Sequence, residues 1–273
     1  MSTWHGAAPP EVAPPGAAGW MRAVARGIPM ALVVFGGLAV LLLVRGPERL
    51  LSGHDRPVTS WITVCVCRAV LRIFGIPVQR HGTPAGGGGA TVANHVSWLD
   101  IFVLNAARPV TFVSKAEVEG WPGIGWLARA TGTLFIRRDR REARAQADLF
   151  ADRLARGERL LVFPEGTSTD GQRVLPFKPT LFEAFFDDRL RHAASVQPVS
   201  LRYEAPEGAP AAFYGWWGDM DFGPSLLRAL AARRQGRVSV VYHPAVPVDA
   251  HPNRKSLAHA LETKVREGYA EAI

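Results

Sequence analysis

Apolar residues are first concentrated in a run near the start of the chain, at residues 28–44. The run reads IPMALVVFGGLAVLLLV, contains no charged side chain and lies between Arg26 and Arg45. Together with one flanking glycine it reaches the length that an α-helix needs to cross a bilayer. A signal peptide and a buried core helix are the alternatives, but the RGPERLL that follows is a poor cleavage site. We therefore expect a membrane-spanning helix.

The basic residues around this run predict its orientation. Arg45, Arg49 and Arg56 follow the run, whereas Arg22 and Arg26 precede it. Because cytoplasmic loops carry an excess of Lys and Arg, this bias predicts that the downstream domain faces the cytoplasm. We expect the protein at the inner (cytoplasmic) membrane.

A second apolar segment follows at residues 58–78 and reads VTSWITVCVCRAVLRIFGIPV. Arg68 and Arg72 interrupt it four residues apart, so the two guanidinium groups would share one face of a helix. A helix with one charged face is better suited to the membrane surface than to the hydrocarbon core. The segment therefore predicts an interfacial helix.

From about residue 86 the pattern changes to short apolar segments that alternate with helical ones. A helix is expected over 140–156, and a final amphipathic helix over 254–270. Strands separated by helices predict an α/β fold, with a central mixed, largely parallel sheet flanked by helices, behind the membrane helix and the interfacial helix. The strand candidates are 90–93, 109–114, 133–137, 159–163, 196–202 and 237–243, and the apolar side of the helix over 140–156 carries Ala147, Phe150, Ala151 and Leu154.

These patterns divide the chain into four parts. Residues 1–26 are expected to be a disordered N-terminus, because their first part is rich in Ala, Pro and Gly. Residues 27–80 would hold the membrane-spanning and interfacial helices, residues 85–249 the α/β domain, and residues 250–273 the C-terminal helix. No internal repeat is apparent.

Charge and cysteine content limit the class of protein. Lys and Arg number 32 against 24 Asp and Glu, which suits an anionic partner such as a membrane surface or a phosphorylated substrate. Nucleic acid is a poor candidate, because the chain has neither a zinc-finger pattern nor an aromatic RNA-binding signature. Cys65 and Cys67 are the only cysteines and are too close in sequence for a normal disulfide. They also fall short of a zinc-ligand set, so we expect no metal and a reducing compartment.

The candidate chemistry begins in the stretch GGGGATVANHVSWLDIFVLN, residues 86–105. His95 follows a β-branched segment, and Asp100 lies five residues further on. One interpretation is structural: Ser97 and Asp100 have the spacing of a capping box that would start a helix over 98–106. The other is catalytic, because a carboxylate in the first helical turn can orient an imidazole that acts as a general base. The pair alone does not decide between them.

Three further stretches change that balance: GTLFIRR (132–138), VFPEGTSTDG (162–171) and VQPVSL (196–201). Together with NHVSWLD, these blocks in this order resemble the glycerolipid acyltransferase family, whose best-known member is 1-acylglycerol-3-phosphate acyltransferase. The resemblance covers roughly residues 85–205, and an N-terminal pair of membrane helices also fits it.

The resemblance implies roles for particular residues. His95 would be the general base and Asp100 its orienting partner. Arg138, in the pattern Gly-x-x-Phe-Ile-x-Arg, would bind the phosphate of the acceptor, although an arginine at the membrane surface is the alternative. Glu165, Gly166 and Thr167 would form part of the acceptor site. A tight turn is the structural alternative for the glycine, and an ion pair or helix carboxylate the alternative for the glutamate.

The sequence also departs from the family pattern. Ser168 stands where an arginine is common, and Arg137 stands where the residue is often acidic. These departures concern the phosphate contact and leave the residues expected for acyl transfer unchanged. Arg137, Arg140 or Lys178 would be available to compensate, although each is equally compatible with a solvated surface charge.

Acyl transfer suits these residues chemically. An alcohol must lose its proton as it attacks a thioester, which a histidine can accept directly. No Cys or Ser with a partnered base stands out, so no covalent acyl-enzyme is expected. A hydrolase is disfavoured because the chain has no Gly-x-Ser-x-Gly elbow. A non-catalytic lipid-binding module is disfavoured because binding alone does not need the positioned base of His95 and Asp100.

The expected reaction is transfer of a fatty acyl group to the free hydroxyl of lysophosphatidic acid, forming phosphatidic acid in phospholipid synthesis. The alternative acceptor is a lyso-ornithine lipid or another lysolipid without a phosphomonoester. Acyl-carrier protein or coenzyme A would carry the acyl group as a thioester, and no cofactor is expected. The expected partners are therefore the lysolipid, the thioester donor and an anionic membrane.

Overall fold

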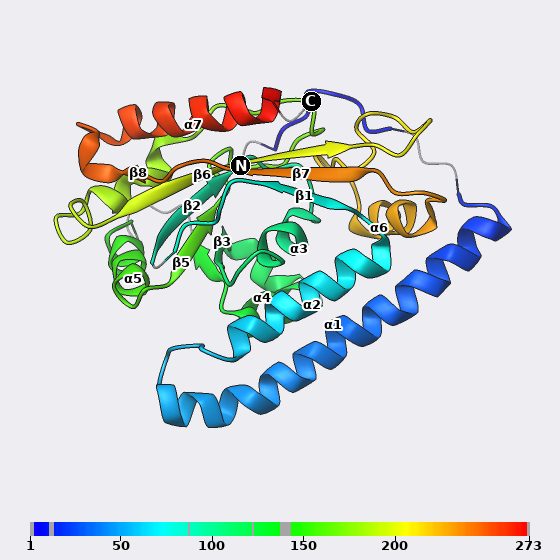
Figure 1. Cartoon of the computed structure of the whole chain (residues 1–273), viewed down its shortest axis with the longest axis horizontal. Coiled ribbons are helices and arrows are strands. Elements are labelled where there is room, and N and C mark those ends of the chain that lie inside the picture. Colours follow the sequence, from blue (N-terminus) through cyan, green and yellow to red (C-terminus); the bar gives the residue numbers. More distant parts are fainter. Residues whose placement is uncertain (1–2, 11–13, 87, 122, 137–142, 272–273) are drawn as a thin grey trace.

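The computed structural model describes residues 3–10, 14–86, 88–121, 123–136 and 143–271, and over these ranges its centre is an eight-stranded sheet (Figure 1). The strand order is β1-β7-β6-β2-β5-β3-β4, and β8 pairs with β6. The central strands β6, β2, β5, β3 and β4 are parallel, whereas β7 is antiparallel to β6. The expected mixed, largely parallel sheet is confirmed. The strands are β1 Val78–His81, β2 Gly89–Ala93, β3 Thr111–Lys115, β4 Leu134–Ile136, β5 Arg159–Val162, β6 Ser195–Glu204, β7 Arg237–Tyr242 and β8 Val246–Pro247.

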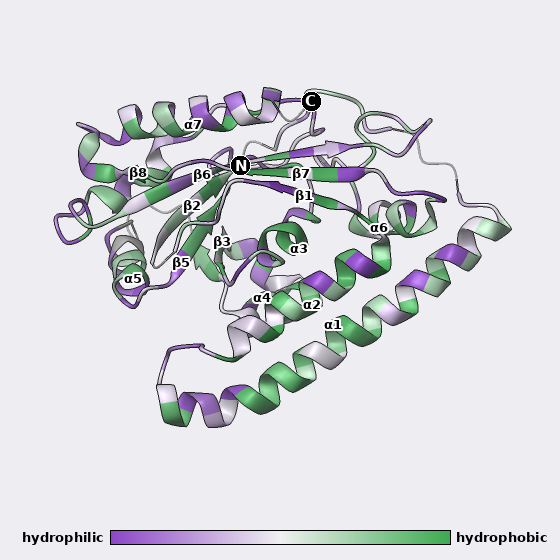
Figure 2. Ribbon diagram, in the orientation of Figure 1, coloured by the Kyte–Doolittle hydropathy of each residue, from purple (hydrophilic) through white to green (hydrophobic). Residues whose placement is uncertain are grey.

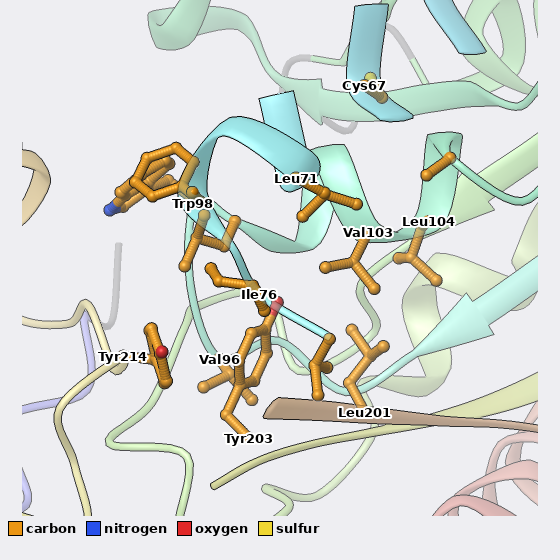
Figure 3. Packing of buried hydrophobic residues seen from close by; sticks show 14 of the residues in the cluster. Cys67, Leu71, Ile76, Val96, Trp98, Val103, Leu104, Leu201, Tyr203 and Tyr214 are labelled. Carbon is orange, nitrogen blue, oxygen red and sulfur yellow. The ribbon is translucent and has the colours of Figure 1, made fainter. Parts of the chain in front are cut away.

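Successive residues of the central strands point into two separate cores. Val92 and Leu160 face the helices over 143–155, 179–186 and 254–271. Their neighbours Ala93 and Leu161 face the helices over 59–74, 100–105 and 222–231. Figure 3 shows the second of these cores. The helices around the sheet are α3 Asp100–Asn105, η1 Ala116–Gly120, α4 Ile124–Thr131, α5 Ala143–Ala155, η2 Pro179–Phe186, α6 Phe222–Ala231, η3 Val248–Ala250 and α7 Arg254–Glu271.

Two long helices precede the sheet and pack against each other, α1 at Ala17–Ser52 and α2 at Thr59–Phe74 (Figure 1). Among the described residues, α1 is the one helix that has the length and apolar composition of a membrane span. Only 11% of its most apolar window is buried, and Figure 2 shows its apolar character. Residues 17–26 belong to this helix, so the prediction of disorder through residue 26 is wrong for them.

The start of α1 is ordered because it bonds to α6. Arg22 donates from Nε to the carbonyl of Ala231 at 2.8 Å. Arg26 donates from Nη1 to the carbonyls of Leu230 and Ala232, at 2.8 and 2.6 Å. The last carbonyls of a helix have no partner within the helix, so these guanidinium groups satisfy the end of α6 and fix α1 to the domain.

Helix α2 is shorter than the segment 58–78 that was predicted for it. Gly75 adopts φ 74°, ends the helix and bonds back to its last turn, after which Val78 begins β1. Arg68 does not lie on a free polar face: it donates to the carbonyls of Ala106 and Ala107, at the end of α3. The interfacial location of α2 stays a prediction, with Arg72 as its exposed arginine.

A buried glutamate joins the two long helices. Glu48 of α1 is 6% exposed, and its Oε1 accepts hydrogen bonds from the N–H groups of Val58 and Thr59 at 2.7 and 2.9 Å. Its Oε2 accepts from the Thr59 hydroxyl and from Arg45. Because Val58 has no side chain that can cap α2, the carboxylate from α1 supplies the cap.

We expect Glu48→Ala to lower the melting temperature of the detergent-solubilised protein. The variant leaves two N–H groups and a hydroxyl in a buried place without an acceptor, a cost of about 1–3 kcal/mol. Glu48→Gln should give a smaller loss, because its amide oxygen still accepts. The exposed Glu117 provides a control, and Glu117→Ala should be neutral. Equal melting temperatures for the Glu48 and Glu117 variants would contradict this role.

Candidate active site

The candidate site lies at one edge of the sheet, where parallel strands end. Strands β2 and β5 are neighbours, with Val92 opposite Val162, and each runs into a loop at the same edge. His95 follows Val92 by three residues, and Glu165 follows Val162 by three residues. The carboxyl edge of a parallel sheet is the usual place for ligands in α/β folds. The register therefore brings two of the sequence blocks together.

His95 and Asp100 form a direct hydrogen bond across the turn that precedes α3. Nδ1 of His95 lies 2.8 Å from Oδ2 of Asp100, whose side chain is fully buried. The same oxygen accepts the N–H groups of Val96 and Ser97, at 2.8 and 3.1 Å. One carboxylate thus performs both predicted tasks, because it orders the turn and orients the imidazole.

The capping-box prediction is correct for Asp100 and wrong for Ser97. The serine hydroxyl accepts the N–H of Leu99 at 3.3 Å, and the N–H of Asp100 donates to the backbone carbonyl of Ser97 instead. The helix also begins at Asp100 and ends at Asn105, inside the expected 98–106. The residues before Asp100 form an irregular turn, because their N–H groups bond to its carboxylate.

Tyr203 is a member of this cluster that sequence reasoning missed. Its hydroxyl donates to Oδ1 of Asp100 at 2.7 Å from near the end of β6, and the residue is 6% exposed (Figure 3). Burial, together with the nearby Asp100 charge, raises the pKa of Tyr203, so the phenol keeps its proton. It therefore acts as a donor to Asp100. No motif links these two residues, because β6 and β2 become neighbours only in the folded sheet.

The other ring nitrogen of His95 is available for chemistry. Among the described residues Nε2 has no hydrogen-bond partner, and the side chain is 20% exposed. The imidazole stacks on Phe163, with ring centroids 4.0 Å apart and an interplanar angle of 12°. A ring held at Nδ1 by a carboxylate presents Nε2 as a proton acceptor. The described residues contain no group of three or more His, Cys, Asp and Glu side chains arranged to hold a metal.

Glu165 stabilises the His95 turn through hydrogen bonds to backbone N–H groups. Its side chain is 1% exposed, Oε1 accepts the N–H of His95 at 2.7 Å, and Oε2 accepts the N–H of Leu175 at 2.8 Å. Burial, with a smaller contribution from the charge of Asp100, raises the pKa of Glu165 to about 8. The carboxyl group of Glu165 thus joins two backbone segments inside the protein, and a role of this residue in the acceptor site stays a prediction.

The other residues of the Pro-Glu-Gly-Thr block form a turn at the same edge. Gly166 adopts φ 72°, a conformation that favours glycine. Thr167 is half-buried, and its hydroxyl oxygen lies 3.5 Å from the N–H of Trp4 in the N-terminal segment. Lys178 lies next to this turn, since its backbone N–H donates to the carbonyl of Pro164 at 2.9 Å. A contact of these residues with the acceptor stays a prediction.

Arg138 lies outside the described residues, as do Arg137 and Arg140. Strand β4 ends two residues earlier at Ile136, parallel to β3. Because β3 lies beside β5, Ile136 ends β4 at the same edge of the sheet as the His95 turn. The phosphate-binding role of Arg138 remains a prediction.

Comparisons with known proteins find a matching family model and several similar chains. A family model described as Acyltransferase matches residues 76–202. The chain is 52% identical to a lyso-ornithine lipid O-acyltransferase of Rhodobacter capsulatus, over 98% of this chain and 97% of that protein. It is 31% identical to a 1-acyl-sn-glycerol-3-phosphate acyltransferase of Neisseria gonorrhoeae, over 72% and 76% of the two chains. The crystal structure of the acyltransferase PlsC from Thermotoga maritima has the same fold, with a TM-score of 0.65, 21% identity and coverage of 93% and 95%.

We expect Glu165→Gln to change how stability depends on pH. The folded protein holds the Glu165 proton up to about pH 8, whereas the unfolded carboxyl group releases it near its ordinary pKa of 4.5. The unfolded state therefore binds fewer protons in this window, so the free energy of unfolding falls as the pH rises from 4.5 to 8. The glutamine variant should lose this part of the fall. Thermal melts in detergent at several pH values measure it.

The control for this experiment is Glu207→Gln, at an exposed glutamate. It should keep the pH dependence of the parent protein. The same pH dependence in the parent and in Glu165→Gln would contradict a proton held by the buried Glu165.

Proposed function

The chain belongs to the acyltransferase family that includes lyso-ornithine lipid and 1-acyl-sn-glycerol-3-phosphate acyltransferases, and from that premise we propose that its acceptor is a lyso-ornithine lipid. The observation that carries this proposal is the 52% identity to a lyso-ornithine lipid O-acyltransferase along almost all of both chains. Lysophosphatidic acid, the acceptor first expected from the sequence, is the second candidate. The more distant relatives that use the glycerophosphate name favour it.

The composition of the Pro-Glu-Gly-Thr loop favours the same acceptor. Ser168 is half-buried and uncharged at the position where the family commonly has an arginine. An arginine at this point suits a phosphomonoester, because its planar fork can bond two phosphate oxygens. A headgroup that carries the amine of ornithine would be repelled by such a cation. The substitution is therefore compatible with an acceptor that lacks the phosphate.

In the proposed reaction, Nε2 of His95 accepts the proton of the acceptor hydroxyl as that oxygen attacks the thioester carbonyl. Asp100 stabilises the imidazolium at Nδ1, and the Tyr203 hydroxyl holds the opposite oxygen of Asp100. When the tetrahedral intermediate collapses, the carbon–sulfur bond breaks and the imidazolium protonates the leaving thiolate. The products are an ester and a free thiol, which is that of acyl-carrier protein or coenzyme A. No covalent acyl-enzyme is formed.

The setting of the reaction is the membrane surface. The apolar side chains exposed on α1 include Leu32, Phe35 and Leu43, which are 69%, 51% and 76% exposed. Such a surface is much larger than isolated exposed residues and suits contact with lipid. We place the protein at the cytoplasmic face of the inner membrane, where acyl thioesters and lysolipids meet.

We expect His95→Ala to reduce acyl transfer at least ~100-fold, the usual contribution of a general base. The variant should remain folded and membrane-bound, because the backbone bonds of the turn to Glu165 and Thr169 do not use the imidazole. The rate with purified protein and labelled acceptor measures the loss. His192→Ala, at a histidine whose side chain is 76% exposed, is the control. Full activity in a folded His95→Ala protein would favour a role other than catalysis by this residue.

The acceptor is tested with purified protein, both thioester donors, and labelled lyso-ornithine lipid or lysophosphatidic acid. We expect acylation of lyso-ornithine lipid to exceed that of lysophosphatidic acid. Ser168→Arg should then lower kcat/KM for lyso-ornithine lipid, because it places a cation beside the ornithine amine, and Ser168→Ala is the uncharged control. Robust acylation of lysophosphatidic acid, with none of lyso-ornithine lipid, would establish the second candidate instead.

A further inference from the structure

A groove of about 940 Å³ lies between the start of α1 and helix α6, outside the candidate active site. The two helices are in contact, and Figure 1 shows α6 beside the N-terminal end of α1. Among the described residues that line it, none is Asp or Glu, and three are arginines: Arg22, Arg228 and Arg233. Trp20, Pro224 and Leu227 contribute apolar walls. The groove thus combines cationic groups with an apolar surface.

The most unusual group in the groove is the guanidinium of Arg228. Its Nε and Nη1 atoms are buried and have no hydrogen-bond partner among the described residues. Nη2 donates to the carbonyl of Gly215 at 3.3 Å, and the guanidinium lies over the ring of Phe213. Burial lowers the pKa of Arg228, and no carboxylate is among the causes that act on it. Buried cations are normally paired, so an anion in the groove would lie beside a guanidinium that has no carboxylate partner among the described residues.

Arg22 and the N-terminal end of α1 add positive electrostatic potential to the groove. Arg22 uses Nε to bond the carbonyl of Ala231, and its other two guanidinium nitrogens have no hydrogen-bond partner among the described residues. Helix α1 begins after Gly16, which has no side chain to cap it, and the first residues of this 36-residue helix line the groove. The positive end of a helix and arginine forks are both favourable partners for a phosphate.

The neighbouring surface indicates where such a phosphate would come from. Trp20 and Met21, at the start of α1, are 51% and 67% exposed, and exposed apolar side chains continue along the helix. Tryptophan is enriched at the level of lipid headgroups. A ligand with a phosphate at the arginines and hydrocarbon beside α1 therefore matches both parts of the surface.

We propose that this groove binds the headgroup phosphate of an anionic phospholipid, whose acyl chains extend along the exposed apolar side of α1. The site does not depend on the proposed acceptor, because none of its lining residues belongs to the His95, Glu165 or Thr167 turns. It is nevertheless joined to them. Ser225 of α6 accepts the indole N–H of Trp98, three residues after His95, at 3.1 Å.

The test uses the full chain in a non-ionic detergent and isothermal titration with three probes: dihexanoyl phosphatidylglycerol, dihexanoyl phosphatidylcholine and inorganic phosphate. We expect saturable binding of one equivalent of phosphatidylglycerol, with weaker binding of the other two. Arg228→Gln and Arg233→Gln should each weaken it by roughly 5–10-fold or more, as expected for a lost charged hydrogen-bond donor. Arg234→Gln removes the same charge from the adjacent exposed position, which does not line the groove, and should change it less than about 2-fold.

Three results would overturn the proposal. One is equal binding of phosphatidylglycerol and phosphatidylcholine, and another is binding that neither Arg228→Gln nor Arg233→Gln weakens. The third is inorganic phosphate binding as tightly as phosphatidylglycerol, which would indicate a free anion instead of a lipid. Arg233 is exposed, so its variant keeps the test decisive even if Arg228→Gln proves unstable.

Discussion

The buried carboxylate of Asp100 is the constraint on which the candidate site depends. It accepts four hydrogen bonds, from the His95 ring, the N–H groups of Val96 and Ser97, and the Tyr203 hydroxyl. A buried carboxylate is costly unless each oxygen finds donors, and here both oxygens do. The turn, the imidazole and the central strand β6 are therefore held by one charge. A rearrangement of the turn would remove three of these four donors from that charge.

A second carboxyl group holds the same turn from the neighbouring strand. Glu165 follows β5 and accepts the N–H of His95, while the carbonyl of His95 accepts the N–H of Thr169 in the same loop. The backbone on both sides of the imidazole is thus fixed before any substrate binds. Such preorganisation matters for a general base, because its efficiency depends on a fixed distance to the proton that it accepts.

Local patterns were sufficient to predict much of the fold. The six strand candidates and the C-terminal helix are present with small shifts at their ends, and Phe150, Ala151 and Leu154 are buried as their spacing predicted. Strand β1 was not predicted, because it is a short edge strand with mostly exposed side chains. Strand β8 has only two residues and gives almost no periodic signal.

The site was predicted only as far as its residues lie close in sequence. His95 and Asp100 are five residues apart, so their contact could be argued from one helical turn. Tyr203 lies 103 residues from Asp100, and only the register of β6 brings it there. The burial of Glu165 was equally hidden, because a Pro-Glu-Gly turn has no pattern that distinguishes a ligand contact from a bond to the backbone of another loop.

The attachment of α1 at both ends has a consequence for how the enzyme meets the bilayer. Arg22 and Arg26 join its start to α6, and Glu48 joins its end to α2. A helix that is bonded to one domain at two points cannot act as a flexible linker. Its two ends stay on the same side of that domain's surface. The depth at which α1 lies in the lipid therefore sets the height of the sheet edge that carries His95 above the membrane. With His95 as the proposed base, the reacting hydroxyl has to reach a group of fixed height, so the enzyme would select lysolipids by how far their headgroups rise from the hydrocarbon.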